Sequence, residues 1–369
     1  MMTGFGLSRK TMFRRAMKMI VLLTLAGTAS IGGDARSAYA SPDSQYTKAK
    51  EIFQADSRIP LNAVLTASAN VPDRLEAFAR QTVNGLAGHA PFNGWNEAGL
   101  DYTPLGPGTH SWLVTLEHDD KPLGYLIITS DNAGGYVLSE YGLGTDLPYS
   151  LAPLERALAD GGWITPGTKG GKTLLPSLPS GSRIESVYAP AAPLWKITIK
   201  GAKPLYVHAV TNEIIPEPTP EKLSQKSEAG GKGSGITSAA VSLSPSLNLP
   251  PQRFWTTTQA TRTNSEGDPY SDLLWLAAPS LKVSSGSEFQ KLLPANSHKT
   301  LMFTAGKQNA SYAAPFSLTG WQRWTKQGTA VFYVTVPHRN LDIIRYIPAE
   351  HLIRSGQFRE TSNSFSSNG

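Results

Sequence analysis

The sequence predicts an α+β fold in which helices pack on antiparallel β-meanders, followed by a small β-rich C-terminal domain. Three observations predict this class. An apolar stripe with helical spacing precedes short segments in which apolar and polar residues alternate, and turn sequences separate those segments. The 369 residues include no cysteine, so packing rather than disulfide bonds must stabilise the fold. Residues 217–251 are rich in Pro, Ser, Gly, Lys and Glu, a composition typical of an interdomain linker.

Residues 1–40 have the three parts of a secretory signal peptide. They begin with basic residues, continue through an apolar run at Met19–Ile31, and end at the small-residue site Ala38-Tyr39-Ala40. We therefore expect a secreted, extracellular protein that begins at Ser41. A leader that is kept as a membrane anchor is the alternative, although the apolar run is shorter than the roughly 20 residues that span a bilayer.

The net charge of +6 comes mainly from the leader, whose six basic residues and one acidic residue supply five of those charges. The rest of the chain is therefore close to neutral, at +1. A near-neutral chain gives no charge argument for nucleic acid as a partner or for attraction to an anionic membrane. We also expect no transmembrane helix after signal cleavage.

The region 41–216 opens with two expected helices. The first is short and covers 46–53. The second begins near Pro72 and ends around Gly88, and proline and an acidic residue are both favoured in its first turn. One face of the second helix carries the apolar residues Leu75, Phe78, Ala79, Val83 and Leu86.

A three-stranded antiparallel meander is expected next, on 111–118, 124–130 and 135–141, because apolar and polar residues alternate there and Asp-rich turns lie between the segments. A helix at 154–159 and a second, shorter set of strands follow. These strands cover 195–199, 205–210 and 213–215, with a tight turn at Thr211-Asn212.

The region 252–360 is expected to be the small β-rich domain. Ser285 and Glu288 stand at capping-box spacing and predict a helix. Strands are expected at 300–304, 316–324 and 329–336. A last helical turn at 348–354 is expected to end at Gly356, and residues 361–369 form a polar tail.

The segment Pro204-Leu205-Tyr206-Val207-His208-Ala209-Val210-Thr211-Asn212-Glu213-Ile214-Ile215 resembles the closing hairpin of PepSY-type domains. His208 stands at the position of the family's aspartate and Asn212 at the position of its turn glycine, and asparagine tolerates the left-handed backbone of such a turn. The segment 124–131 is similar to a strand in the propeptides of secreted bacterial cysteine proteases. Both resemblances imply a non-catalytic extracellular module that inhibits, chaperones or accompanies a peptidase.

No set of residues predicts catalysis, a cofactor or a metal site. A Gly-x-Ser-x-Gly nucleophile turn is missing, and no cysteine can serve as a nucleophile. Asp119-Asp120 and Asp131-Asn132 are best explained as turns. The histidines lack metal-ligand spacing, and they are His89, His110, His118, His208, His298, His338 and His351. Among them, His208 alternates with apolar strand residues, so a half-buried structural role is expected for it.

Aromatic residues in the C-terminal region give the one candidate surface for a partner. Tyr312, Trp321 and Trp324 could bind an extracellular protein or a cell-wall glycan if they are exposed, or form the core of a small domain if they are not. Trp321 and Trp324 lie three positions apart, which places them on opposite faces of a strand.

We therefore expect a secreted, non-catalytic binding or regulatory protein that modulates an extracellular peptidase. Two alternatives stay open. One is a cell-wall-associated hydrolase whose carboxylate pair the sequence does not reveal. The other is a structural component of the cell surface that associates with itself.

Overall fold

The structure is a computed structural model, and its described residues all lie in one compact unit, Thr47–Gly369. The helix expected at 46–53 and the linker expected at 217–251 lie outside the described residues. Those residues are 58–60, 70–106, 111–131, 134–164, 168–169, 172–173, 177–188, 193–199, 201–215, 256–258, 260–262, 268–271, 273–295, 299–305 and 315–362.

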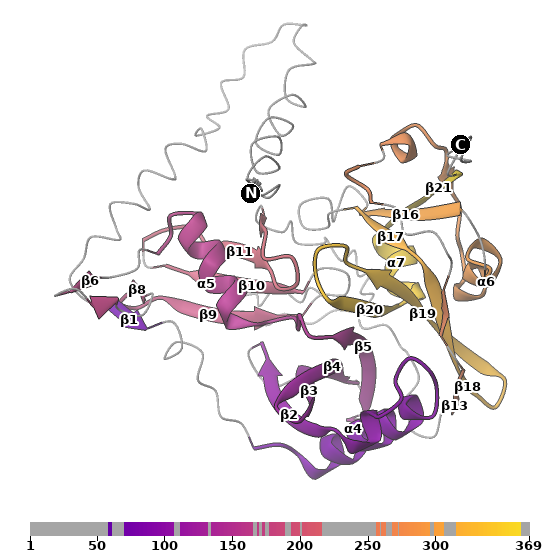
Figure 1. Cartoon of the computed structure of the whole chain (residues 1–369), viewed down its shortest axis with the longest axis horizontal. Coiled ribbons are helices and arrows are strands. Elements are labelled where there is room, and N and C mark those ends of the chain that lie inside the picture. The colour runs from indigo at the N-terminus through magenta and orange to yellow at the C-terminus, as the bar shows by residue number, and fades with distance from the viewer. Residues whose placement is uncertain are drawn as a thin grey trace, which may run out of the picture. The chain divides into compact units, whose positions relative to one another are not determined.

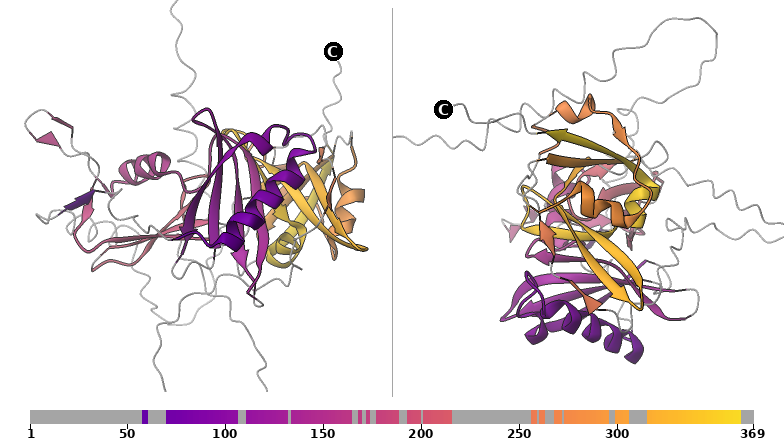
Figure 2. Two further views of the ribbon diagram at one scale, coloured as in Figure 1. Left: turned by 90° about the horizontal axis from the view of Figure 1, so that it is seen from below. Right: turned by 90° about the vertical axis from the view of Figure 1, so that its right-hand side faces the viewer.

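The long N-terminal helix is confirmed. Helix α4 (Asp73–Ala87) follows the extended Pro72 and buries the five apolar residues that predicted it. Those side chains share one hydrophobic cluster with residues of the neighbouring strands, including Trp112 and Leu126. Figure 2 shows α4 lying along these strands. The apolar stripe of the helix is thus covered by one face of a sheet.

The predicted meander is also confirmed and gains a fourth strand. Its antiparallel strands are β2 (Gly99–Leu105), β3 (Ser111–His118), β4 (Lys121–Ser130) and β5 (Tyr136–Gly144). Asp119 and Asp120 join β3 to β4 with φ angles of 50° and 59°, which agrees with their interpretation as turn residues. The sequence pattern does not predict β2.

Strands from the C-terminal region extend the same sheet (Figure 1). Its order is β13-β18-β19-β20-β5-β4-β3-β2, and β14 also pairs with β18. The added strands are β13 (Thr256–Thr257), β14 (Thr261–Arg262), β18 (Gly320–Lys326), β19 (Thr329–Pro337) and β20 (Ile343–Pro348). The expected division into domains 41–216 and 252–360 is not confirmed, because β20 hydrogen-bonds to β5 across that division.

A four-stranded antiparallel sheet contains the expected second set of strands. Its order is β12-β11-β10-β9, from β12 (Ile214–Ile215), β11 (Leu205–His208), β10 (Leu194–Thr198) and β9 (Arg183–Val187). Helix α5 (Leu151–Asp160) buries Leu154 and Leu158 in one cluster with Ile197 and Val207 of this sheet. Asn212 adopts φ 58°, so the left-handed turn expected there is confirmed.

A second four-stranded sheet has the order β15-β21-β16-β17, from β15 (Ser280–Leu281), β21 (Gly356–Ser362), β16 (Lys299–Ala305) and β17 (Phe316–Leu318). The single strand expected at 316–324 is therefore two strands in two sheets, because the chain changes sheet at Thr319, whose N–H bonds to Thr335 O. The polar tail expected from Thr361 begins later, since β21 continues to Ser362.

The helices of the C-terminal region are short. The capping-box segment forms η4 (Gly286–Glu288) and α6 (Phe289–Leu292), and the last expected helix is α7 (Ala349–Ser355). No helix in the described part of the chain has the length and apolar character needed to cross a bilayer. Two further pairs of strands are antiparallel: β1 (Arg58–Pro60) pairs with β8 (Ser177–Pro179), and β6 (Thr168–Lys169) pairs with β7 (Lys172–Thr173). The remaining elements are the short 3-10 helices η2 (Trp95–Glu97) and η3 (Leu274–Leu276).

Candidate functional site

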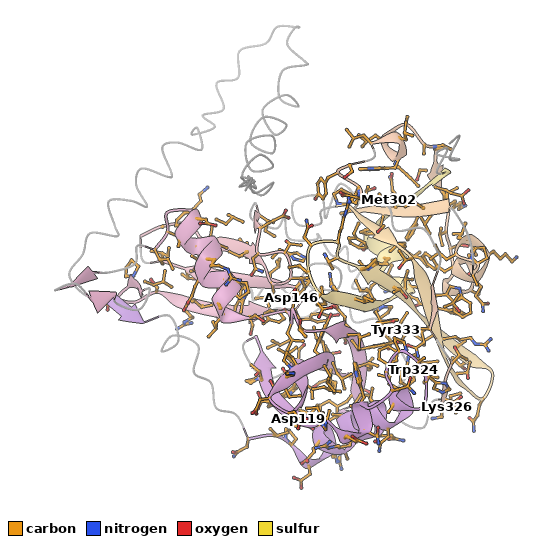
Figure 3. The ribbon with its side chains drawn as sticks, viewed as in Figure 1. Asp119, Asp146, Met302, Trp324, Lys326 and Tyr333 are labelled. Atoms are coloured by element: carbon orange, nitrogen blue, oxygen red, sulfur yellow. The ribbon has the colours of Figure 1, made fainter. Side chains whose placement is uncertain are left out.

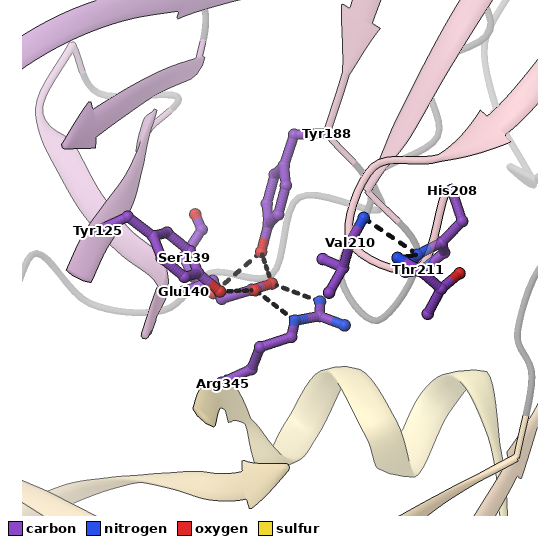
Figure 4. Close-up of polar contacts among 8 residues, drawn as sticks. All are labelled: Tyr125, Ser139, Glu140, Tyr188, His208, Val210, Thr211 and Arg345. Carbon is purple, nitrogen blue, oxygen red and sulfur yellow. Dashed lines mark hydrogen bonds and ion pairs between the residues drawn. The ribbon is translucent and has the colours of Figure 1, made fainter. Parts of the chain in front are cut away.

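A buried ion pair lies where β5 meets β20. Arg345 donates to Glu140 through two bonds, Nε to Oε1 at 2.7 Å and Nη2 to Oε2 at 3.0 Å, as Figure 4 shows. Glu140 is 0% exposed and Arg345 is 1% exposed. Two such charges are stable in the interior only when they are paired and fully hydrogen-bonded.

A β-bulge directs Glu140 inward. The register of β4 and β5 shifts between Ile127 and Ile128, so that Ile127 lies opposite Glu140 while Ile128 lies opposite Leu138. Ser139 is the extra residue on β5. Residues that lie directly opposite each other share a face of the sheet, and Ile127 belongs to the core beneath α5, so Glu140 points into the same core.

Gly142 leaves room for the ring of Tyr125, which is the third member of the network. Tyr125, Gly142 and Arg345 stand opposite one another on three adjacent strands. A Cβ atom on Gly142 would lie only 2.2 Å from Cε1 of Tyr125. Because that atom is missing, the Tyr125 ring lies across β5 and its hydroxyl donates to Glu140 Oε1 at 2.6 Å.

Tyr188 joins the network from a fourth segment of the chain. It follows β9, and its hydroxyl lies 3.2 Å from both Glu140 Oε2 and the carbonyl oxygen of Ser139 (Figure 4). The Glu140 carboxylate therefore faces four donor contacts: two from Arg345 and one from each tyrosine. That number matches the acceptor capacity of a carboxylate.

The charges of this network are fixed at neutral pH. Burial, followed by the negative charge of Glu140, raises the pKa of Tyr125 and of Tyr188 well above 10. Burial alone would lower the pKa of Arg345, but the Glu140 carboxylate raises it above its usual value. A saturated, solvent-free carboxylate has no free position from which to accept a substrate proton. Chemically, the arrangement acts as a structural clamp that joins β4, β5, β20 and the residue that follows β9.

A half-buried histidine, His338, lies near this clamp. Burial, and then the charge of Arg345, lowers the pKa of His338 to about 3. Its Nε2 atom is buried and has no hydrogen-bond partner among the residues that the structure describes. His338 is therefore neutral at pH 7, and protonating it would place a second cation in the interior beside Arg345.

An aromatic cluster fills the opposite face of the β5 and β20 strands. The rings of Tyr141 and Tyr346 stack at 4.8 Å with an interplanar angle of 2°. Trp324 donates from Nε1 to the Tyr141 hydroxyl at 3.3 Å, and the Tyr333 hydroxyl donates to Leu138 O at 2.7 Å. Figure 3 labels Trp324 and Tyr333 in this region. Residues from both halves of the chain thus share one core.

The aromatic residues proposed for partner binding have different positions. Trp324 is 2% exposed and belongs to the core, so it presents no surface to a partner. Trp321 is half-buried against the core of the C-terminal sheet and donates from Nε1 to Leu293 O at 3.2 Å. The two residues do lie on opposite faces of β18, as their spacing predicted. Tyr312 lies outside the described residues.

His208 has the structural role expected of it. It is buried, and its Nδ1 accepts hydrogen bonds from the backbone N–H groups of Val210 at 3.3 Å and Thr211 at 3.1 Å (Figure 4). These bonds hold the turn that leads to Asn212. Elsewhere in the described part of the chain, no three His, Asp or Glu residues are grouped to hold a metal ion.

Asp146 and Asp342 are two acidic residues brought together from distant segments. Asp342 donates its backbone N–H to Asp146 Oδ2 at 2.6 Å, and Thr145 donates to Asp342 Oδ2 from its N–H and its hydroxyl. These carboxylates are exposed and bind backbone groups of the connections that follow β5 and precede β20. Such bonds are ordinary turn chemistry, as at the other Asp-rich turns.

An exposed apolar segment is the most unusual surface feature. Tyr270, Leu273, Leu274 and Leu276 are each 55–58% exposed. We call residues 270, 271 and 273–276 the docking segment. Trp275 at its centre turns inward and donates from Nε1 to Pro269 O at 2.9 Å, so the neighbouring leucines point outward. The sequence pattern did not predict this surface.

The docking segment is held at both ends. Before it, Asp268 accepts from Arg339 Nη1 at 2.7 Å. After it, Arg359 donates from Nη1 to the carbonyl oxygen of Ala278. These two contacts tie residues on both sides of the exposed leucines to Arg339 and Arg359.

The sequence was compared with known families and with curated proteins. No family model matches it, and no curated protein matches it significantly.

Proposed function

We propose that this chain is an exported, non-catalytic binding protein that acts on another extracellular protein, and that a peptidase is the partner to test first. The docking segment carries the proposal. Large apolar side chains that stay exposed are typical of a surface that a partner covers. Burying the exposed part of each leucine on binding would contribute about 1 kcal/mol.

The rest of the molecule supports this role as a frame. The clamp around Glu140 and the aromatic cluster join strands from both halves of the chain into one sheet. A rigid frame lowers the entropy lost on binding, because the segment is already in place. On this proposal the helix and meander of the N-terminal region are part of the frame, and the leader directs the protein out of the cell.

The choice of a peptidase rests on the resemblance of the 204–215 hairpin to PepSY-type domains. The features that carry the resemblance fit the structure locally, since Asn212 has a left-handed backbone and His208 supports the turn. A helix, α5, packs on the sheet that contains this hairpin.

A pull-down tests the proposal. Residues 41–369, which contain the whole compact unit, are incubated with the producing cell's secreted proteins and its wall fraction. We expect recovery of a peptidase at a defined stoichiometry, with a change in its activity. The triple variant Leu273→Ser, Leu274→Ser and Leu276→Ser is expected to lose this partner. Lys121→Ser, at the exposed first residue of β4, is the control and is expected to retain it.

Two results would overturn the proposal outright, and a third would count against a protein ligand. One is equal recovery of the peptidase by the triple variant. The other is turnover of a peptide or wall glycan by residues 41–369 alone, which would favour the hydrolase. Retention on purified wall without a protein partner would also count against a protein ligand.

A further inference from the structure

An asparagine followed by a glycine lies in an exposed turn between α4 and β2. The turn is closed by the N–H of Trp95, which donates to Phe92 O at 3.2 Å. Gly94 has φ 90° and ψ −9°, which are the angles of the third residue of a type II turn, so the turn requires a glycine after Asn93. Asn93 and Gly94 are both exposed. The fold therefore holds an Asn-Gly pair in contact with solvent.

The backbone nitrogen of Gly94 is open to reaction. The hydrogen bond of the turn uses Phe92 O and the N–H of Trp95, and the described residues supply no acceptor for the N–H of Gly94. A Cβ atom on Gly94 would meet none of the described residues within 4 Å. Glycine also lacks the Cβ atom that would hinder its nitrogen from approaching a neighbouring side chain. The Gly94 nitrogen thus meets few obstacles on its way to the side-chain amide of Asn93.

We propose that Asn93 is a site of spontaneous deamidation in the folded protein. The Gly94 nitrogen loses its proton to hydroxide and forms a bond to Cγ of Asn93, and the side-chain amide nitrogen leaves as ammonia. Water then opens the resulting ring. Cleavage at Cγ gives aspartate. Cleavage at the backbone carbonyl carbon gives isoaspartate, in which the main chain runs through the former side chain.

Helix α4 contains the same dipeptide, Asn84-Gly85, in a protected position. Gly85 lies inside the helix, where its N–H donates to the carbonyl oxygen four residues earlier. Attack on Asn84 would first require the end of the helix to open, which costs free energy. The two sites have the same sequence and differ in their structure, so Asn84 is an internal control for Asn93.

Deamidation at Asn93 would also affect the aromatic core. Phe92 and Trp95, on either side of the pair, are 0% and 1% exposed, and their rings lie 4.9 Å apart. Trp95 packs closely on the sheet, because a Cβ atom on Gly124 would lie only 2.6 Å from its Cζ2. Isoaspartate adds an atom to the main chain between these two anchored residues, so it should disturb their packing. Aspartate leaves the main chain unchanged and should not.

Peptide mapping by mass spectrometry tests the site. The purified protein is kept at mildly alkaline pH, and fragment ions that separate position 84 from position 93 follow the conversion of each amide to an acid. We expect Asn93 to react at least about tenfold faster than Asn84 in the folded protein. In concentrated urea the two rates should converge, because neither dipeptide is then held in a fold. Mildly acidic pH should slow the reaction at Asn93, since less hydroxide is present to remove the proton.

Two variants complete the test. Asn93→Gln should stop the reaction at position 93 and leave Asn84 unaffected, because glutamine would have to close a larger ring. Asn93→Asp reproduces the aspartate product and should unfold at the same temperature as fresh protein, whereas the purified isoaspartate form should unfold at a lower temperature. Equal rates at Asn84 and Asn93 in the folded protein would overturn the inference. An isoaspartate form as stable as Asn93→Asp would overturn its link to the aromatic core.

Discussion

The ring of Tyr125 occupies the space that a side chain at position 142 would fill, with Cε1 only 2.2 Å from the Cβ that Gly142 lacks. Gly142→Ala should therefore force the ring away from Glu140 and destabilise the protein by about 1–3 kcal/mol. Urea unfolding measures this loss. The double variant with Tyr125→Ala should cost less than the sum of the two single variants, because removing the ring relieves the clash. Additive losses would contradict this account.

The ion pair should behave as a unit. Arg345→Met leaves Glu140 charged and unpaired in the interior, so we expect a loss of about 3–5 kcal/mol in the free energy of unfolding. Adding Glu140→Leu removes the stranded charge and should recover much of that loss. If the double variant is as unstable as Arg345→Met alone, the unpaired charge of Glu140 is not the cause of the lost stability.

Stability should fall in mild acid because of two histidines. Burial is the main cause that lowers the pKa of His338 and of His351 to about 3, with further lowering by Arg345 and Arg354 respectively. In the unfolded chain both histidines titrate near 6.5. Between pH 6.5 and 3 the unfolded state therefore binds protons that the native state does not, and each histidine lowers stability by up to about 1.4 kcal/mol per pH unit as the pH falls.

Unfolding free energies at pH 7 and pH 5 check this expectation. His338→Asn should reduce the difference between the two values, since asparagine does not titrate. The variant is compared with the wild type at each pH, so that carboxylates, which titrate in both proteins, cancel. If His338→Asn leaves the difference between the free energies at pH 7 and pH 5 unchanged, residues other than His338 cause the acid sensitivity.

The two tryptophans of β18 should differ in their contribution to stability. Trp324 is buried and bonds to Tyr141, so Trp324→Ala should cost about 3–5 kcal/mol. Trp321 is partly exposed, so Trp321→Ala should cost clearly less. Thermal unfolding of both variants makes the comparison, and a larger loss at Trp321 would mean that the surface position matters more than the core position.

Local signals predicted the local elements. The stripe of α4 and the alternation of the meander depend on neighbours within a few residues, and so does the left-handed turn at Asn212. Such local patterns do not depend on distant parts of the chain, so the sequence alone predicts these elements.

Pairing between distant segments could not be predicted in this way. Glu140 and Arg345 are 205 positions apart, and nothing near either residue indicates its partner. Strand β20 is buried on both faces, so its residues do not alternate and it was missed. The docking segment was missed for a related reason, since periodicity identifies apolar faces but cannot tell which of them remains uncovered.

The pairing of β20 with β5 has a consequence for the order of assembly. A chain that is synthesised from its N-terminus presents β2 to β5 long before β20 is made, and until then β5 exposes a row of unsatisfied backbone groups. Closing so distant a contact is slow, and the open edge can meanwhile recruit another chain. Loss of the last 30 or so residues would remove β20 and make that exposed edge permanent, so we expect truncated chains to aggregate through β5.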